Sequence, residues 1–154
     1  MRIKCLIIDD EPLAINVIKN YLEPIENFEV IETFSNPIEG LNFLKNNKVD
    51  VIFLDINMPI MNGWECLKLI KKDENYQDIP VIMISTSSHK NDMETASKLG
   101  ALGYFVKPND FNDLKTIAIT TNGQLPKEDI HGFLIFDLEK NNMNNIQILD
   151  DKNQ

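Results

Sequence analysis

Short hydrophobic runs alternate with segments that carry hydrophobic residues at helical spacing over most of the chain. The first, third and fourth runs are almost continuous in Ile, Leu, Val, Phe and Met, which is typical of strands buried on both faces of a parallel sheet. The runs are Ile3–Ile8, Phe28–Phe34, Val49–Leu54, Val81–Ile84 and Tyr104–Val106. This pattern predicts five strands.

The segments between these runs carry helix signals. The first segment places its hydrophobic residues on one helical face, namely Ala14, Val17, Ile18, Tyr21 and Leu22. In the second segment, Asn36 predicts an N-cap and Pro37 the first helical residue. Asn91 and Glu94 predict the cap of a later helix, which Gly100 ends.

A last helix is predicted after Asp110, which can cap it; its hydrophobic face consists of Phe111, Leu114, Ile117 and Ala118. The repeated alternation of strand and helix predicts an α/β fold, with a doubly wound parallel sheet and helices on both faces. The regular pattern ends near residue 122. We predict one domain over residues 1–122 and a C-terminal extension over residues 123–154 that is too short for a separate output domain.

The extension contains one strongly hydrophobic stretch, Phe133–Phe136, which is too apolar to lie in water without a contact. We predict that Gly132–Leu138 is an ordered extended segment that packs on the chain's own domain or on a partner. Asn145–Leu149 is a candidate strand for a hairpin with it, because the Asn-rich stretch between them is turn-prone. The alternative is a flexible tail with a short apolar patch.

Charge and composition exclude some classes of function. The formal net charge of -9 argues against DNA binding, which requires clustered Lys and Arg. We expect no signal peptide and no membrane span, because the first hydrophobic run is short and two aspartates end it. Cys5 and Cys66 lack metal-ligand spacing, and we expect a reducing cytoplasm as the location.

Polar and charged residues follow four of the predicted strands. These residues are Asp9, Asp10 and Glu11, then Asp55, then Ser85, and finally Lys107. Any one of them alone is most simply a turn residue, a cap or a surface charge. The carboxyl ends of parallel strands meet at one edge of the sheet, where such folds bind ligands, so the residues are expected to converge.

The expected cluster has the composition of a site for a metal ion and a phosphoryl group. Carboxylates packed together repel one another unless a cation neutralises them, and oxygen ligands suit Mg²⁺. A lysine and a hydroxyl opposite an aspartate can stabilise the anionic phosphoryl group during its transfer.

Several segments resemble the receiver domain of two-component response regulators, in particular the stand-alone regulators of the chemotaxis type. The matching segments are Ile7–Glu11, Phe53–Pro59, Met61–Gly63, Ile84–Ser85 and Tyr104–Pro108. The resemblance runs from about Lys4 to about Thr121. It implies a flavodoxin-like sheet of five parallel strands in the order 2-1-3-4-5.

The resemblance also implies the chemistry of the site. Asp55 would be the phosphoacceptor. Asp10 would bind Mg²⁺ directly, Asp9 would bind it through water, and Asn57 would offer its backbone carbonyl. Lys107 would pair with the carboxylate and later with the phosphate.

Further roles follow from the same resemblance. Ser85 would hydrogen-bond the phosphate, and Tyr104 would change rotamer as Ser85 moves, although Tyr104 also fits a simple core aromatic. The Lys107–Pro108 bond is expected to be cis. Gly63 would start the third helix or allow a tight turn before it. Asn57 and Ser87 would affect the water that hydrolyses the aspartyl phosphate.

The function implied is a signalling switch in a phosphorelay, with Mg²⁺-dependent self-phosphorylation and autodephosphorylation. The expected partners are a histidine kinase or phosphotransfer protein and a downstream protein target, with no nucleic acid or membrane. We expect a monomer or a phosphorylation-dependent dimer. One alternative is a phosphatase with an Asp-x-Asp pair, but Asn57 stands where that pair needs an acid. A transcription factor is the other alternative, and the short, non-basic extension argues against it.

Overall fold

One sheet runs through the computed structural model, which describes residues 2–23, 28–87, 89–107, 118–119 and 132–135. Its strands are β1 (Ile3–Ile8), β2 (Phe28–Phe34), β3 (Val51–Asp55), β4 (Val81–Ser85), β5 (Gly103–Val106), β6 (Ala118–Ile119) and β7 (Gly132–Ile135). Their order is β2-β1-β3-β4-β5-β7-β6. The first five strands pair in parallel, so the predicted order 2-1-3-4-5 is confirmed.

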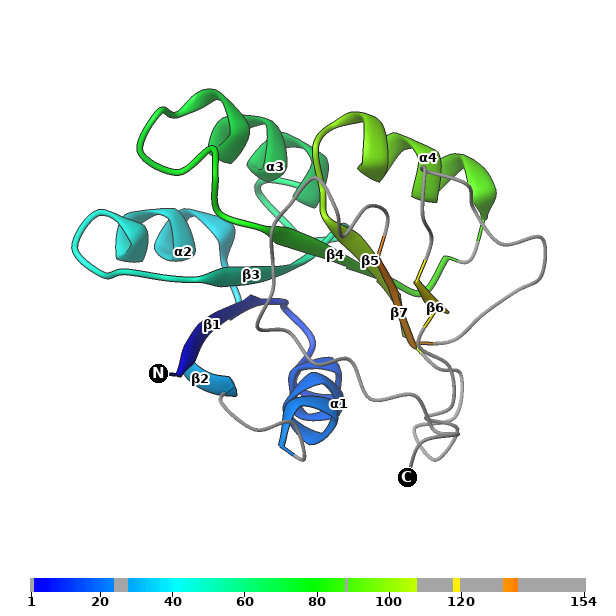
Figure 1. Ribbon diagram of the computed structural model, residues 1–154, viewed down its shortest axis with the longest axis horizontal. Helices are drawn as coiled ribbons and strands as arrows, with labels where there is room; N and C mark the ends of the chain where they lie inside the picture. Colours follow the sequence, from blue (N-terminus) through cyan, green and yellow to red (C-terminus); the bar gives the residue numbers. More distant parts are fainter. Residues whose placement is uncertain (1, 24–27, 88, 108–117, 120–131, 136–154) are drawn as a thin grey trace.

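Helices cover both faces of this sheet (Figure 1). They are α1 (Pro12–Leu22), α2 (Pro37–Leu44), α3 (Gly63–Lys72) and α4 (Lys90–Lys98). The helix α1 lies on one face, and α2, α3 and α4 lie on the other. None of the helices among the described residues is long and apolar enough to cross a membrane.

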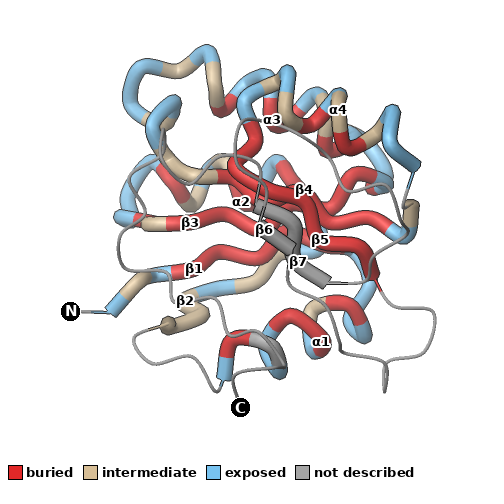
Figure 2. Tube along the Cα trace, turned by 45° about the vertical axis from the view of Figure 1, so that its right-hand side comes forward, coloured by how far each residue is buried: buried red, intermediate tan, exposed pale blue. Residues whose placement is uncertain are grey.

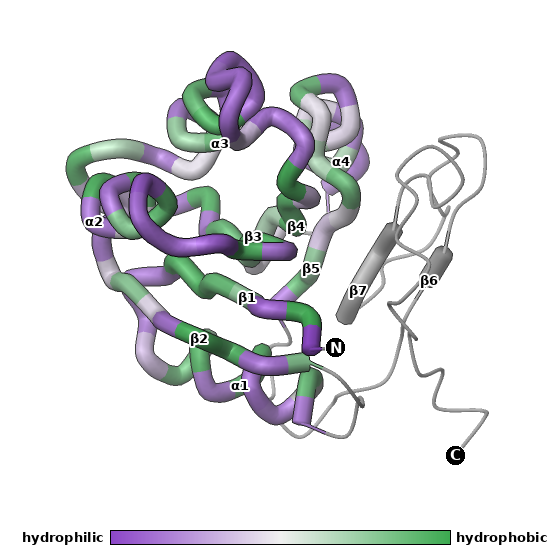
Figure 3. The backbone as a smooth tube through the Cα atoms, turned by 60° about the vertical axis from the view of Figure 1, so that its left-hand side comes forward, coloured by the Kyte–Doolittle hydropathy of each residue, from purple (hydrophilic) through white to green (hydrophobic). Residues whose placement is uncertain are grey.

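The central strands are buried on both sides, and their successive side chains enter two separate hydrophobic clusters. In β1, Leu6 and Ile8 face the cluster beneath α2, α3 and α4, whereas Cys5 and Ile7 face α1. β3 and β4 are buried along their whole length, as Figure 2 shows. In Figure 3 much of β1 and β2 is hydrophobic, while the helices carry both hydrophobic and hydrophilic residues. The continuous apolar runs of the sequence reflect this two-sided burial.

The predicted helix caps are correct in one place and wrong in another. Asn36 caps α2, and its side chain accepts a hydrogen bond from the Ile38 amide. The cap predicted at Asn91 is wrong, because α4 already begins at Lys90 with His89 at the N-cap position. Gly100 follows α4 with a φ of 94°, a left-handed conformation that suits glycine.

Two short strands extend the five predicted ones. β7 pairs antiparallel with β5, so residues 132–135 of the segment predicted to be extended pack along the edge of the chain's own sheet; residues 136–138 of that segment lie outside the described residues. β6 pairs in parallel with β7, which corrects the prediction that Ala118 belongs to a helix. The pairing along β7 gives residue 118 a strand conformation that the spacing of hydrophobic residues did not indicate.

Several predictions lie outside the described residues. They are the rest of the last helix, the Lys107–Pro108 bond and the candidate strand Asn145–Leu149. The domain boundary at residue 122 stays a prediction.

Candidate functional site

The carboxyl ends of the parallel strands hold a small set of polar side chains. Asp9 follows β1, Asp55 ends β3, Ser85 ends β4 and Lys107 follows β5. These four are the buried polar or charged side chains within the described part of the chain, and none is more than 7% exposed. The topology thus brings together residues predicted to meet, and the interior is otherwise apolar.

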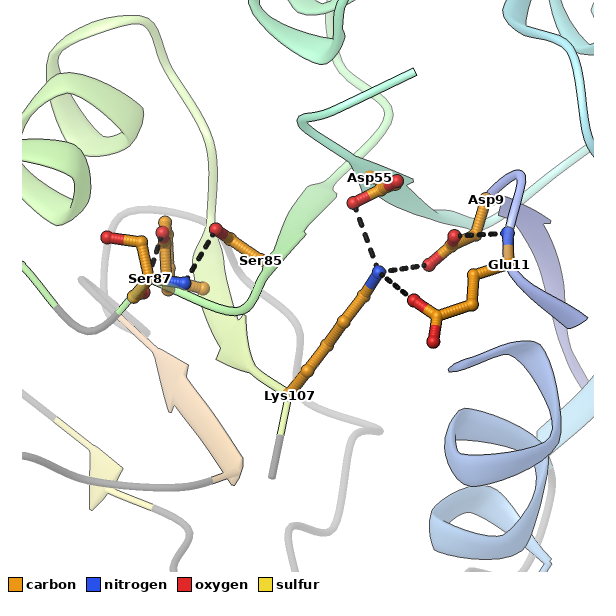
Figure 4. Close-up of polar contacts among 7 residues, drawn as sticks. Asp9, Glu11, Asp55, Ser85, Ser87 and Lys107 are labelled. Carbon is orange, nitrogen blue, oxygen red and sulfur yellow. Dashed lines mark hydrogen bonds and ion pairs between the residues drawn. The ribbon is translucent and has the colours of Figure 1, made fainter. Parts of the chain in front are cut away.

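The Lys107 ammonium lies at the centre of this set (Figure 4). Its Nζ atom is 3.1 Å from Asp9 Oδ2, 3.3 Å from Asp55 Oδ1 and 3.4 Å from Glu11 Oε2. Asp9 is held in place by the backbone amide of Glu11, which donates a 2.9 Å hydrogen bond to Asp9 Oδ1. One cation therefore faces three carboxylates, so the negative charge is only partly balanced.

Burial and mutual repulsion shift the pKa values of these groups. Burial raises the pKa of Asp55 to about 7, and the neighbouring charge of Asp9 adds to this increase. Burial also raises the pKa of Asp9, against the lowering influence of the Glu11 amide and of Lys107. For Lys107, burial alone would lower the pKa, but the Asp9 and Asp55 carboxylates outweigh it and raise the pKa. The carboxylates of the site outnumber its positively charged groups, so a further cation would stabilise them.

The residues fit a divalent cation that prefers oxygen ligands. Asp9, Asp10 and Asp55 each offer a carboxylate oxygen, and these oxygens lie within 4.8 Å of one another. Asp9 Oδ2 is buried and accepts no hydrogen bond from the described residues, so the ion pair with Lys107 is its compensation. Asp10 is exposed, and Asn57 lies exposed in the loop after β3. An all-oxygen set with one side open to water is the type of site that Mg²⁺ occupies in proteins.

The loop between β3 and α3 passes close beneath Asp55. The Gly63 amide donates a 2.7 Å hydrogen bond to the Ile56 carbonyl. A Cβ atom at Gly63 would overlap the Asp55 carbonyl oxygen and the Ile56 Cα atom, which explains why glycine starts α3. Ile60, in the same loop, is 77% exposed with a φ of 73°, an uncommon conformation for a β-branched residue.

The hydroxyl groups near the site form a separate network. Ser85 Oγ accepts a 3.0 Å hydrogen bond from the Ser87 amide. Tyr104 is fully buried, and its phenol donates a 3.0 Å hydrogen bond to the Ser87 carbonyl. Burial raises the Tyr104 pKa. Tyr104 is thus a core aromatic with a polar contact to the loop after β4, and both predicted readings of this residue remain compatible with its position.

Two contacts near the site were not predicted from the sequence. Glu11 was noted beside the aspartate pair, but its ion pair with Lys107 was not predicted. Asp92, which accepts a hydrogen bond from Ser87 Oγ, was not singled out. The position of Glu11 directly after two aspartates was the available signal for the first; the sequence carried none for the second.

Residues 5–119 match the family described as the response regulator receiver domain, and the chain belongs to this family. It is 38% identical to a chemotaxis protein CheY homolog of Campylobacter jejuni, over 68% of this chain and 81% of that protein. The structure of CheY4 of Vibrio cholerae superposes with a TM-score of 0.63 at 28% identity, covering 73% of this chain and 92% of that one. A chain in the crystal structure of the CheX-CheY-BeF3-Mg²⁺ complex from Borrelia burgdorferi gives a TM-score of 0.59 at 29% identity, over 71% and 81% of the two chains. The chain is a CheY-like receiver domain, and receiver domains are signalling switches.

Proposed function

We propose that Asp55 accepts a phosphoryl group from a phosphohistidine on a histidine kinase or phosphotransfer protein, and that the chain acts as a phosphorylation-dependent switch. The observation that carries this proposal is the burial of Asp55 at the end of β3, with Oδ1 3.3 Å from Lys107 Nζ and Asp9 beside it. In the transfer, an Asp55 oxygen bonds to phosphorus as the P–N bond of the phosphohistidine breaks, and the electron pair leaves with the imidazole.

The residues around Asp55 prepare the site for this reaction. Asp9, Asp10, Asp55 and the backbone carbonyl of Asn57 would hold Mg²⁺. When bound, the cation offsets the charge that develops on the phosphoryl group. Lys107 moves from its carboxylate partners to a phosphoryl oxygen, which keeps the product charge paired inside the protein.

Phosphorylation changes the surface through which the chain meets its partner. The new phosphoryl oxygens attract the Ser85 hydroxyl, and Tyr104 follows as the loop after β4 rearranges. The surface of α4 and β5 then has a different affinity for a downstream protein, either as a monomer or as a phosphorylation-dependent dimer. The free cysteines Cys5 and Cys66 support a reducing cytoplasm as the location.

Phosphorylation with a small-molecule donor tests the proposal. Incubation with acetyl phosphate and Mg²⁺ is expected to add one phosphoryl group to the intact chain, measured by mass spectrometry. Asp55→Asn is expected to abolish the addition, and Asp10→Ala to reduce it more than Asp9→Ala. The control Asp73→Asn changes a half-buried aspartate at the C-cap of α3, whose carboxylate accepts a hydrogen bond from the Asn75 amide, and is expected to leave labelling unchanged. Labelling of another residue with Asp55 unmodified, or an equal rate without Mg²⁺, would contradict the assignment.

A further inference from the structure

Ser87, in the loop between β4 and α4, uses all of its polar groups in hydrogen bonds. Its amide donates to Ser85 Oγ at 3.0 Å, and its carbonyl accepts from the Tyr104 phenol at 3.0 Å. Its hydroxyl accepts from the His89 amide at 3.2 Å and donates to Asp92 Oδ2 at 2.6 Å. A single half-buried residue therefore joins β4, β5 and α4.

The contact with Ser87 determines where the Ser85 hydroxyl points. Figure 4 shows Ser85 Oγ directed toward Ser87, on the side away from Asp55. A phosphoryl group on Asp55 can receive a hydrogen bond from Ser85 only after this hydroxyl turns. The two contacts therefore require different positions of the Ser85 hydroxyl, which accepts from the Ser87 amide and would donate to the phosphoryl group.

Asp92 holds Ser87 in place. The distance of 2.6 Å between Ser87 Oγ and Asp92 Oδ2 is that of a charge-assisted hydrogen bond, which is stronger than one between neutral groups. Asp92 lies in the first turn of α4, so the bond fixes the loop to a rigid element. Glu94, two residues further along α4, makes only a 3.8 Å ion pair with the exposed Lys90 among the described contacts.

We propose that Asp92 is a positioning residue of the switch. Through Ser87 it keeps the Ser85 hydroxyl on the Tyr104 side of the loop until a phosphoryl group on Asp55 draws the hydroxyl away. The inference rests on the proposed function of Asp55 and deepens it by naming a restraint on the same site. Removing the restraint makes the phosphoryl response easier, so the affinity for a phosphoryl mimic rises.

Titration of the full chain with beryllofluoride in the presence of Mg²⁺ tests this role, with the amide spectrum of residues 85–106 as the readout. Asp92→Ala and Ser87→Ala are each expected to lower the Kd about three- to tenfold, the size of one net hydrogen bond. Both substitutions remove the bond between Ser87 and Asp92, and Ser87→Ala also removes the acceptor of the His89 amide. The double variant is therefore expected to match Ser87→Ala. Asp92→Asn keeps an oxygen that can accept from Ser87 and should stay within about twofold of the wild type.

Two controls separate the bond from other effects of these substitutions. Glu94→Ala removes a carboxylate from the same helix and is expected to leave the Kd unchanged. The affinity for Mg²⁺ alone should be the same in all variants, since none of them touches Asp9, Asp10 or Asp55. A lower Mg²⁺ affinity in Asp92→Ala would show a general disturbance of the fold and overturn the positioning role.

The remaining outcomes distinguish this inference from the proposed function. If Asp92→Asn behaves like Asp92→Ala and Ser87→Ala has no effect, the charge of Asp92 acts on the anion and the restraint is refuted. If the wild type binds beryllofluoride and all variants bind it with the same Kd as the wild type, the restraint is refuted and the proposed function is not. A wild-type chain that neither binds beryllofluoride nor takes up a phosphoryl group on Asp55 refutes the proposed function, and the restraint with it.

Discussion

The carboxylate of Asp55 makes the stability of the cation-free chain depend on pH. Burial, together with the charge of Asp9, raises its pKa from 3.8 to about 7. Between these values the folded chain holds a proton that the unfolded chain releases. The stability contributed by this proton is complete below the unfolded pKa and is lost as the pH rises through about 7.

Replacing Asp55 with asparagine removes this ionisation. In the absence of divalent cations, Asp55→Asn is expected to raise the free energy of unfolding at about pH 8 by roughly 1–3 kcal/mol, because no buried negative charge has to form. The gain is expected to shrink at about pH 5, where Asp55 is already protonated in the folded wild type. Urea unfolding in the presence of a chelator measures both values.

A solvent-facing carboxylate serves as the control for this measurement. Glu94→Gln, on α4, is expected to change the stability little and equally at both pH values. A destabilised Asp55→Asn protein at the higher pH would contradict the conclusion that the Asp55 charge opposes folding.

Site residues could be predicted from the sequence where the end of a strand fixes their position. Asp9, Asp55 and Lys107 stand directly at strand ends, and parallel strands bring such ends to one edge. The contacts of Glu11 and Asp92 could not be predicted in this way. They depend on where long side chains point once α1 and α4 are packed.

At the level of the elements, the start of α3 and the position of Asp55 depend on one glycine. Gly63→Ala is expected to lower the free energy of unfolding by about 2–3 kcal/mol, because the added methyl group meets backbone atoms that cannot rotate away. The displaced Asp55 should also take up phosphoryl groups more slowly. Urea unfolding and the rate of labelling by acetyl phosphate measure the two effects.

Gly100→Ala is the matched comparison for this substitution. Gly100 has a φ of 94°, so alanine there is strained and should cost about 1 kcal/mol. Its nearest neighbours are side-chain atoms of Lys71, far from the site in the fold, and the labelling rate should stay at the wild-type value. Equal labelling rates in both variants would show that Gly63 does not position Asp55.

The elements themselves were predicted best where one local cause determines them. Continuous apolar runs identified β4 and the buried part of β1 after Lys4, because burial on both faces leaves no polar position there. The start of α4 was predicted wrongly, since Asn91 and Glu94 have the spacing of a cap. In the structure, Ser87 Oγ accepts a hydrogen bond from the His89 amide, and α4 begins at Lys90, before Asn91.

At the scale of the whole molecule, β7 of the C-terminal extension covers the outer edge of β5. Sequence patterns indicated an extended segment near residue 133, but the pairing of β7 with β5 joins residues far apart in the chain and leaves no local signal. An uncovered strand edge presents free amide and carbonyl groups to other chains.

Removing residues 123–154 is therefore expected to promote self-association through β5. The truncated chain should sediment as larger species with increasing concentration, and the amides of Gly103–Val106 should exchange faster at low concentration. Leu134→Pro keeps the full length but removes a backbone donor opposite Tyr104, and it should act in the same direction. A truncated chain that stays monomeric with unchanged exchange would show that β7 does not protect this edge.

In the part of the chain that the structure describes, the buried polar or charged residues lie together at one edge of the sheet, and this has a consequence for how such a sequence can change over time. Asp9, Asp55, Ser85 and Lys107 are the buried polar or charged positions of the described chain. Apart from Gly63, where a side chain would overlap the backbone, and the Tyr104 phenol, the rest of the described interior only has to be apolar and of suitable volume. Apolar interiors tolerate exchange among residues of similar size. Lineages with this architecture can therefore drift apart in nearly every interior position while the chemistry stays fixed at a few. An engineer could likewise redesign the two hydrophobic layers as one task and the reacting edge as another.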